Sequence, residues 1–290
     1  MNGFQTCQPP RRRRGWWVWA LMAGSALAQA SPSAVPVEPK PEARRFGDFL
    51  VVPPTSSERL GGYGPQLSIS FRSRKYRPFG SWEVGGVRPI KALSEGQPML
   101  LAVTSGYSGV GTLLISVQNG VPLSRLLSPI NDLKHPDWGV PQPGREEVLL
   151  FRESGRALDT NTGEVLWFDT RYKAKVYSSG GTLMSVSPDN RLAAFLNFKQ
   201  ILVGGREDGL NAAYQLPADA NVGELADIHH AAYAQAVQAH KDGLPGIDNK
   251  RLAQDMTIAW FATRFHWQAK NGSWELVGRG LGPALPLSER

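Results

Sequence analysis

The feature that most restricts the fold of this chain is a recurrence of similar segments between residues 96 and 216. Three segments each read as a polar turn that leads into an apolar strand: residues 96–103, 144–151 and 188–195. The interval from each segment to the next is nearly constant. Self-similarity at a steady period indicates an array of equivalent supersecondary units, here β units of about 45 residues.

A second pattern follows each of these segments and has the form strand, turn, strand. It covers residues 113–123, 156–168 and 201–214, with turns at Asn119-Gly120, Thr162-Gly163 and Asp208-Gly209. Glycine supplies the positive φ that a tight hairpin needs. Residues 82–90, which contain a Gly-Gly pair, read as an earlier and shorter copy, so the units cover about residues 81–216. This pattern predicts a mainly β fold.

Two strings point to known repeat families. Ser187–Phe195 (SPDNRLAAF) and Asp159–Trp167 (DTNTGEVLW) resemble the SPDGxxLAF and DxxTGxxLW runs of TolB-like and quinoprotein-like β-propellers. The resemblance covers about residues 96–216 and implies a propeller-like array of four-stranded blades. Those families close rings of six to eight blades, whereas the chain from Phe46 onward holds about five such units. An antiparallel sandwich or meander with evenly spaced hairpins is the alternative.

The period ends before the C-terminal part of the chain. Residues 221–241 are alanine-rich and lack proline, which predicts a helix with Leu225, Ile228, Ala232 and Ala236 as its buried stripe. A long strand is expected at Met256–Gln268, followed by a turn at Asn271-Gly272 and a second strand, so the terminal hairpin spans residues 256–279. We expect Phe261, Thr263, Phe265 and Trp267 on one face of that hairpin, with Trp274 packing across from it.

Residues 1–30 have the three parts of a secretory signal peptide. Arg11–Arg14 are followed by an uncharged apolar run, Gly15–Leu27, and by Ala28-Gln29-Ala30. The run is shorter than the roughly 20 residues that a permanent transmembrane helix needs, although an uncleaved anchor is the alternative. The arginines also resemble a twin-arginine motif, so both general secretion and twin-arginine export remain open. We expect a mature protein that starts at Ser31 and is periplasmic or secreted.

Composition narrows what the mature chain can do. The only cysteine, Cys7, leaves with the signal peptide, so no disulfide, thiol nucleophile or cysteine metal site is expected. Removal of the four arginines of the leader leaves 28 of the 32 basic residues against 25 acidic ones, and a net charge of +3 does not indicate nucleic-acid binding. Proline-rich residues 31–45 are interpreted as a disordered tether and residues 46–290 as one β-rich domain, with a first strand at 49–52.

One local group of charges stands out from this balance. Arg72, Arg74, Lys75 and Arg77 lie close together in the sequence and could meet an anionic envelope polymer or lipid. A solvated loop explains the same residues without a ligand. Otherwise contact with a membrane is expected only transiently, through the signal peptide.

Candidate catalytic residues are few. Asp227 and His230 are three positions apart on the expected helix and could form a carboxylate–imidazole pair, and Asp137 lies in a loop. A solvated helix face explains Asp227 and His230 without any chemistry, and this is the preferred interpretation. His229 and His240 would lie about 16 Å apart along the helix, which is too far to share a metal ion. The chain has no H-E-x-x-H, G-x-S-x-G or calcium-loop pattern, so neither a metal nor a cofactor is predicted.

Candidate binding residues are loop aromatics and a loop histidine: Trp82, Tyr107, Trp138 and His135. Loop tryptophans and tyrosines anchor interfaces or stack on sugars, and they equally often fill part of a core. The leading hypothesis is an exported binding protein, with no catalytic role, for a protein or an envelope polymer. One version is an immunity-type inhibitor of a periplasmic toxin. The alternatives are a cell-envelope hydrolase or sugar-acting enzyme that uses Asp227, His230 or Asp137, and a structural envelope component held by the terminal hairpin.

Overall fold

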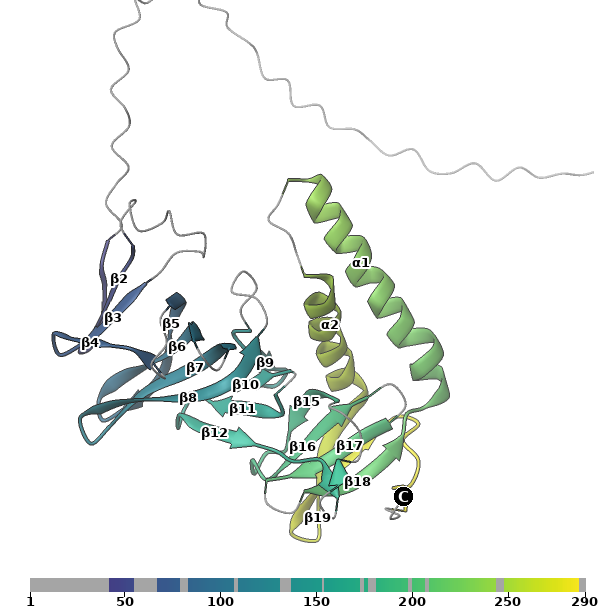
Figure 1. Cartoon of the computed structure of the whole chain (residues 1–290). Coiled ribbons are helices and arrows are strands. Elements are labelled where there is room, and N and C mark those ends of the chain that lie inside the picture. The colour runs from purple at the N-terminus through teal and green to yellow at the C-terminus, as the bar shows by residue number, and fades with distance from the viewer. Residues whose placement is uncertain are drawn as a thin grey trace, which may run out of the picture. The chain divides into compact units, whose positions relative to one another are not determined.

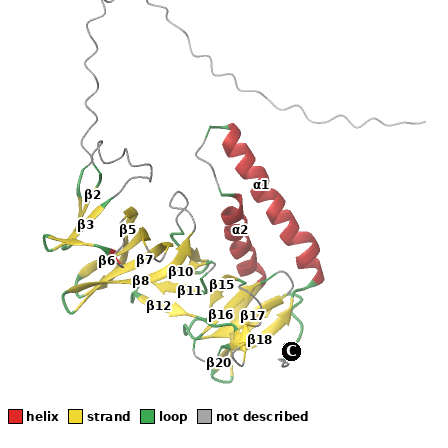
Figure 2. Ribbon diagram, in the orientation of Figure 1, coloured by secondary structure: helices red, strands yellow, loops and turns green. Residues whose placement is uncertain are grey.

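The computed structural model describes residues 42–54, 67–78, 83–106, 109–130, 137–152, 154–172, 175–176, 181–197, 200–206, 209–243 and 248–286. They belong to one compact unit, Lys40–Arg290. The fold is mainly β, with four-stranded antiparallel sheets and two helices (Figures 1 and 2). The predicted signal peptide lies outside the described residues.

Four sheets follow one another along the chain, and each has its strands in chain order. The first sheet contains β1 (Arg44–Phe46), β2 (Phe49–Val52), β3 (Ser68–Phe71) and β4 (Arg74–Tyr76). The second contains β5 (Glu83–Ser94), β6 (Gln97–Gly106), β7 (Gly109–Gln118) and β8 (Val121–Ile130). The third contains β9 (Val140–Gln142), β10 (Arg145–Phe151), β11 (Arg156–Asp159) and β12 (Glu164–Trp167). After a short pair, β13 (Arg171–Tyr172) and β14 (Lys175–Val176), the fourth contains β15 (Thr182–Val186), β16 (Leu192–Leu196), β17 (Gln200–Gly205) and β18 (Leu210–Gln215).

The three segments that define the repeat occupy the same place in their sheets. Each forms the turn before the second strand and then that strand: β6, β10 and β16. The turn has a residue with positive φ in all four sheets, namely Gly47, Gly96, Gly144 and Asn190. The first sheet therefore has an equivalent turn, which the repeat pattern in the sequence does not reveal. The interpretation of residues 82–90 as a shorter copy is wrong, because Glu83–Ser94 is one strand with a register shift between Val84 and Gly86.

Neighbouring sheets pack face to face, and the pleat divides each central strand between two cores. In β6, Leu100 and Ala102 join the core with the first sheet, whereas Met99 and Leu101 join the core with the third. In β10, Leu149 and Phe151 face the second sheet, and Val148 and Leu150 belong to the core of the fourth. Successive side chains of a strand point to opposite faces. Burial on both faces explains why these strands read as continuous apolar runs.

The fourth sheet also packs against the C-terminal elements. These are α2 (Asn249–Arg264), β19 (Phe265–Lys270) and β20 (Ser273–Gly278), which contribute Ile258, Phe261, Phe265 and Leu276 to its core. Figure 1 shows α1 (Leu225–Lys241) beside α2, and a π-helical turn, η3 (Ala220–Glu224), leads into α1. The helix predicted at 221–241 is confirmed. Of its expected stripe Ala232 is buried, and Leu225, Ile228 and Ala236 are half-buried.

The long strand predicted at Met256–Gln268 is wrong, because the chain is helical as far as Arg264. The carboxylate of Asp248 caps this helix by accepting hydrogen bonds from the backbone N–H groups of Lys250 (3.0 Å) and Arg251 (3.3 Å). Buried residues then recur every four positions, at Ala253, Thr257 and Phe261. Phe261 and Thr263 are therefore helical and do not share a strand face with Phe265 and Trp267.

The turn at Asn271-Gly272 is confirmed. Lys270 pairs with Ser273 across it, and Asn271 and Gly272 have φ of 50° and 78°. Trp274 pairs with Ala269 and so lies on the face of Trp267, as expected. Trp267 is half-buried against the core of the fourth sheet, and its indole N–H donates to Ser185 Oγ at 3.1 Å.

Strand pairing begins slightly earlier than the sequence predicted. The predicted strand Phe49–Val52 is confirmed as β2. However, Arg44 and Arg45, assigned to the tether, belong to β1, where they pair with Val51 and Leu50. The remainder of the predicted tether, residues 31–41, lies outside the described part of the chain.

Candidate functional site

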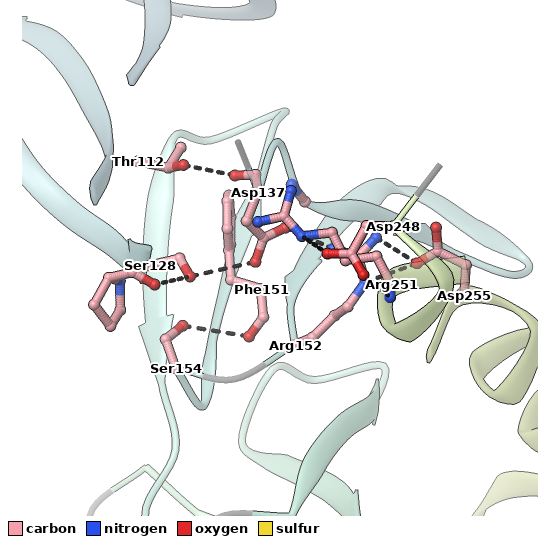
Figure 3. A network of polar contacts seen from close by, with 11 residues as sticks. Thr112, Ser128, Asp137, Phe151, Arg152, Ser154, Asp248, Arg251 and Asp255 are labelled. Atoms are coloured by element: carbon pink, nitrogen blue, oxygen red, sulfur yellow. Dashed lines mark hydrogen bonds and ion pairs between the residues drawn. The ribbon is translucent and has the colours of Figure 1, made fainter. Parts of the chain in front are cut away.

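Asp137 is the one candidate catalytic residue that lies in a dense polar network (Figure 3). It follows β8 and is 5% exposed. Thr112 Oγ1 donates to its backbone carbonyl at 2.7 Å, and Ser128 Oγ donates to its Oδ2 at 3.3 Å. The backbone N–H of Gly139 donates to Oδ1 at 3.1 Å. Asp137 thus ties β7 and β8 of the second sheet to the segment that enters the third.

Arg152 extends this network to α2. It follows β10, and its Nη1 lies 2.8 Å from Asp137 Oδ1. Its Nε donates to Asp255 Oδ1 at 2.7 Å, and its Nη2 contacts the same oxygen. Its backbone carbonyl accepts from Leu183 N–H of β15 at 3.0 Å. One residue therefore joins the second, third and fourth sheets and α2, as Figure 3 shows for the guanidinium between the two carboxylates.

The electrostatics of this site are those of a buried ion pair. Burial raises the pKa of Asp137, and Arg152, the hydrogen bonds from Gly139 and Ser128, and the charge of Arg251 oppose that rise. Both carboxylate oxygens of Asp137 accept hydrogen bonds within the protein. A general base must reach a proton of its substrate. An almost completely buried carboxylate with these partners suits a structural ion pair better than acid–base catalysis.

The structure does not bring the other candidate catalytic residues to Asp137. Asp227 and His230 are exposed on α1, whereas the network around Asp137 draws on β7, β8, β10 and α2. His229 and His240 are exposed on the same helix. The three catalytic candidates therefore do not form one site.

The structure describes only one of the four candidate binding residues. Trp82, Tyr107 and His135 lie outside the described residues. Trp138 is half-buried and packs against the core between the second and third sheets, with Gly86 so close that a Cβ there would lie 3.1 Å from its ring. Of the two roles left open for Trp138, the structure favours packing, because its ring fills the space beside a glycine.

Most of the exposed apolar side chains in the described part of the chain lie elsewhere, on the last strands of two neighbouring sheets. Among the described residues the exposed large apolar side chains are Val52, Val121, Leu123, Leu126, Trp167 and Tyr233. Three of them belong to β8, and Trp167, 61% exposed, ends β12. We call Val121, Leu123, Leu126, Arg156 and Trp167 the edge surface.

Arg156 connects the two strands of the edge surface. It pairs with Trp167 across β11 and β12, and its guanidinium carbon lies 5.2 Å from the centroid of the indole ring. Its Nη1 also donates to the backbone carbonyl of Leu126 in β8. Partial burial lowers the pKa of Arg156. The sequence pointed to Trp167 only as part of a blade-like string, because an aromatic residue beside Leu166 reads as core.

The residues that the structure describes contain no group of three or more histidine, cysteine, aspartate or glutamate side chains placed to hold a metal ion. Among them, neither helix combines the length and the apolar character needed to cross a bilayer.

Comparison of the chain with protein-family models, with curated proteins and with solved structures finds no match. Function therefore has to be argued from the site itself.

Proposed function

We propose that this chain is an exported binding protein that recognises a protein partner through the edge surface. The observation that carries the proposal is the position of the exposed apolar side chains: four of the six in the described part of the chain lie on β8 and β12. Tryptophan and arginine are the residue types most enriched among side chains that dominate binding energy. Here Trp167 and Arg156 lie together, and Arg156 also donates to the backbone carbonyl of Leu126, one of the exposed residues of β8.

The scaffold for this surface is, in our proposal, a propeller-like array of blades. The order of strands within each sheet, the turn shared by all four sheets and the face-to-face cores support it. A stack of separate meanders has the same local features. The two differ in ring closure, and in the described residues no closed ring is detected. The edge surface needs only the contact between the second and third sheets.

Export and the class of partner are part of the same proposal. The charged start, apolar run and A-x-A end of residues 1–30 support secretion into the periplasm or beyond. An exposed tryptophan on β12, with exposed aliphatic side chains on β8 of the neighbouring sheet, suits a protein partner better than a polar polymer. An immunity-type inhibitor of a periplasmic toxin is one protein of this kind. A hydrolase is less well supported, because Asp137 is bound to Arg152 and lies apart from Asp227 and His230.

Substitution of Trp167 by alanine tests the edge surface. The processed protein, immobilised and exposed to periplasmic extract, should retain a partner that mass spectrometry identifies, and Trp167→Ala should weaken that complex about 30-fold, as expected for a residue worth roughly 2 kcal/mol. Thermal melts should hardly change, because the ring is 61% exposed.

Tyr233→Ala is the matched control. Tyr233 is 62% exposed on α1 and does not belong to the edge surface, so its loss should leave the complex intact. Retention of every partner by Trp167→Ala, with loss of partners in Tyr233→Ala, would move the binding site to the helix and contradict the proposal.

A further inference from the structure

The positive charge of the folded chain is concentrated in its first sheet. Among described residues 42–78 there are six basic residues against two acidic ones, whereas from residue 83 onward the described part of the chain has sixteen of each. The undescribed residues 55–66, between β2 and β3 in the sequence, add one residue of each sign, Glu58 and Arg59. The excess therefore belongs to the first sheet and is not a general property of the surface.

The pairing of the strands divides the first sheet into an apolar face, whose rows end in Arg44 and Arg74, and a second face, one row of which has a cation at both ends. Phe49, Val51, Ile69 and Phe71 form the apolar face and pack against the second sheet. The other face has the row Arg45, Leu50, Ser70 and Lys75, and beside it the pair Val52 and Ser68. We call these six residues the basic face. Arg45, Lys75, Ser68 and Val52 are exposed, and Leu50 is half-buried.

The cations of the first sheet are largely free to meet an external anion. The six are Arg44, Arg45, Arg72, Arg74, Lys75 and Arg77, and all are exposed. Within the described part of the chain, only Arg72 forms an ion pair, with Asp48 at 2.7 Å. The group that the sequence pattern marked as a solvated loop is therefore part of a sheet that has two further arginines on its opposite edge strand, β1.

We propose that the basic face docks on the surface of a bilayer that contains anionic phospholipids. Arg45 and Lys75 lie on opposite edge strands, three strand spacings or about 14 Å apart. Leu50 and Val52 lie between them. Cations at the rim of a face with aliphatic side chains at its centre match the headgroup and upper acyl regions of a bilayer. This proposal does not depend on the edge surface, which belongs to other sheets.

A second observation favours a lipid surface over a soluble polyanion. The first sheet holds the first described strand after the apolar run Gly15–Leu27, and 16 residues, 28–43, separate that run from Arg44. A fully extended segment of that length spans at most about 55 Å. With residues 1–30 as the signal peptide of the export proposed above, on which this step rests, the basic face would leave the membrane within that distance of the bilayer. It then needs only weak, reversible attraction to remain there.

Sedimentation with lipid vesicles tests the proposal on the processed chain, which retains the whole compact unit from Lys40 onward. We expect binding to vesicles in which phosphatidylglycerol replaces roughly a third of the phosphatidylcholine, loss of binding in high salt, and little binding to phosphatidylcholine alone. Each basic residue near such a surface changes affinity about fivefold. The double variant Arg45→Gln, Lys75→Gln should therefore bind about 25-fold more weakly.

The control is the double variant Arg191→Gln, Lys241→Gln, which removes the same charge from exposed sites in the fourth sheet and α1. It should bind within about twofold of the parent, and both double variants should melt like the parent, since all four side chains are exposed. Equal weakening by the two double variants would show attraction to net charge alone and overturn the proposal. Tight binding of soluble polyphosphate without binding to vesicles would overturn it in favour of a polyanion.

Discussion

At the scale of single residues, the polar contacts between the sheets and α2 converge on Arg152. Its side chain is 9% exposed and bridges two carboxylates, one of them buried. A buried pair of this kind adds little net stability compared with apolar groups of the same shape, but it is costly to break. Loss of Arg152 should therefore lower the stability of the fold, because it would leave the buried carboxylate of Asp137 without a cation.

Replacement of Arg152 by alanine should lower the free energy of unfolding by about 3–5 kcal/mol, because Asp137 would remain buried without its cation. Urea denaturation measures this change. Arg191→Ala is the control, since the side chain of Arg191 is 82% exposed, and it should stay within about 0.5 kcal/mol of the parent. The double change Arg152→Met with Asp137→Asn should recover much of the loss. An Arg152→Ala protein as stable as the parent would show that the pair carries no structural role.

Only part of this network could be predicted from the sequence. Asp137 was noticed as an acid in a loop, but Arg152 is 15 positions further along the chain, and Asp255 is 103 positions beyond Arg152. Arg152 follows an apolar strand and has no local pattern that sets it apart. Long-range pairing of this kind is decided by how the sheets pack, so residue spacing alone could not reveal it.

At the scale of elements, the sequence predicts correctly those structures that are decided by interactions within a few residues. The Asn271-Gly272 turn and the glycine turns of the sheets were predicted, because a positive φ is a property of one or two residues. The α2 helix was missed, because alternating large residues from Trp260 to Trp267 also suit a strand. Two signals in the sequence indicate this helix: the N-cap residue Asp248, and the spacing of four residues between Ala253, Thr257 and Phe261.

Gly272→Val should destabilise the terminal hairpin and, through it, the core of the fourth sheet. Gly272 has φ of 78°, and a Cβ there would meet no atom within 4 Å, so backbone conformation alone is at issue. The left-handed region costs an ordinary residue roughly 1–2 kcal/mol, and a β-branched residue suits it least. Thermal melts should show this loss for Gly272→Val and a smaller one for Gly272→Asn, since asparagine tolerates positive φ. Equal melting of both variants and the parent would contradict the turn.

At the scale of the whole compact unit, the sheets differ in whether one or both of their faces are buried in a hydrophobic core. The third sheet has a core on both faces, whereas the first has a core on one face and its basic face exposed. Local stability follows burial, and hydrogen exchange reports it. Amides of β10 and β11 should exchange at least about tenfold more slowly than those of β2 and β3 when followed by mass spectrometry. Uniform exchange across the four sheets would show that they unfold as one unit.

The basic face also has a consequence for how copies of this protein behave in solution. Arrays built from similar units risk adding further units at their ends unless the terminal surfaces are polar or covered. Here the first sheet ends the series with Arg45, Ser70 and Lys75, and α2 with β19 and β20 covers the fourth. In the described part of the chain, neither of these two sheets presents a bare apolar face to another molecule. Copies of this protein should therefore not stack end to end through these sheets, and growth into filaments is disfavoured even at high concentration.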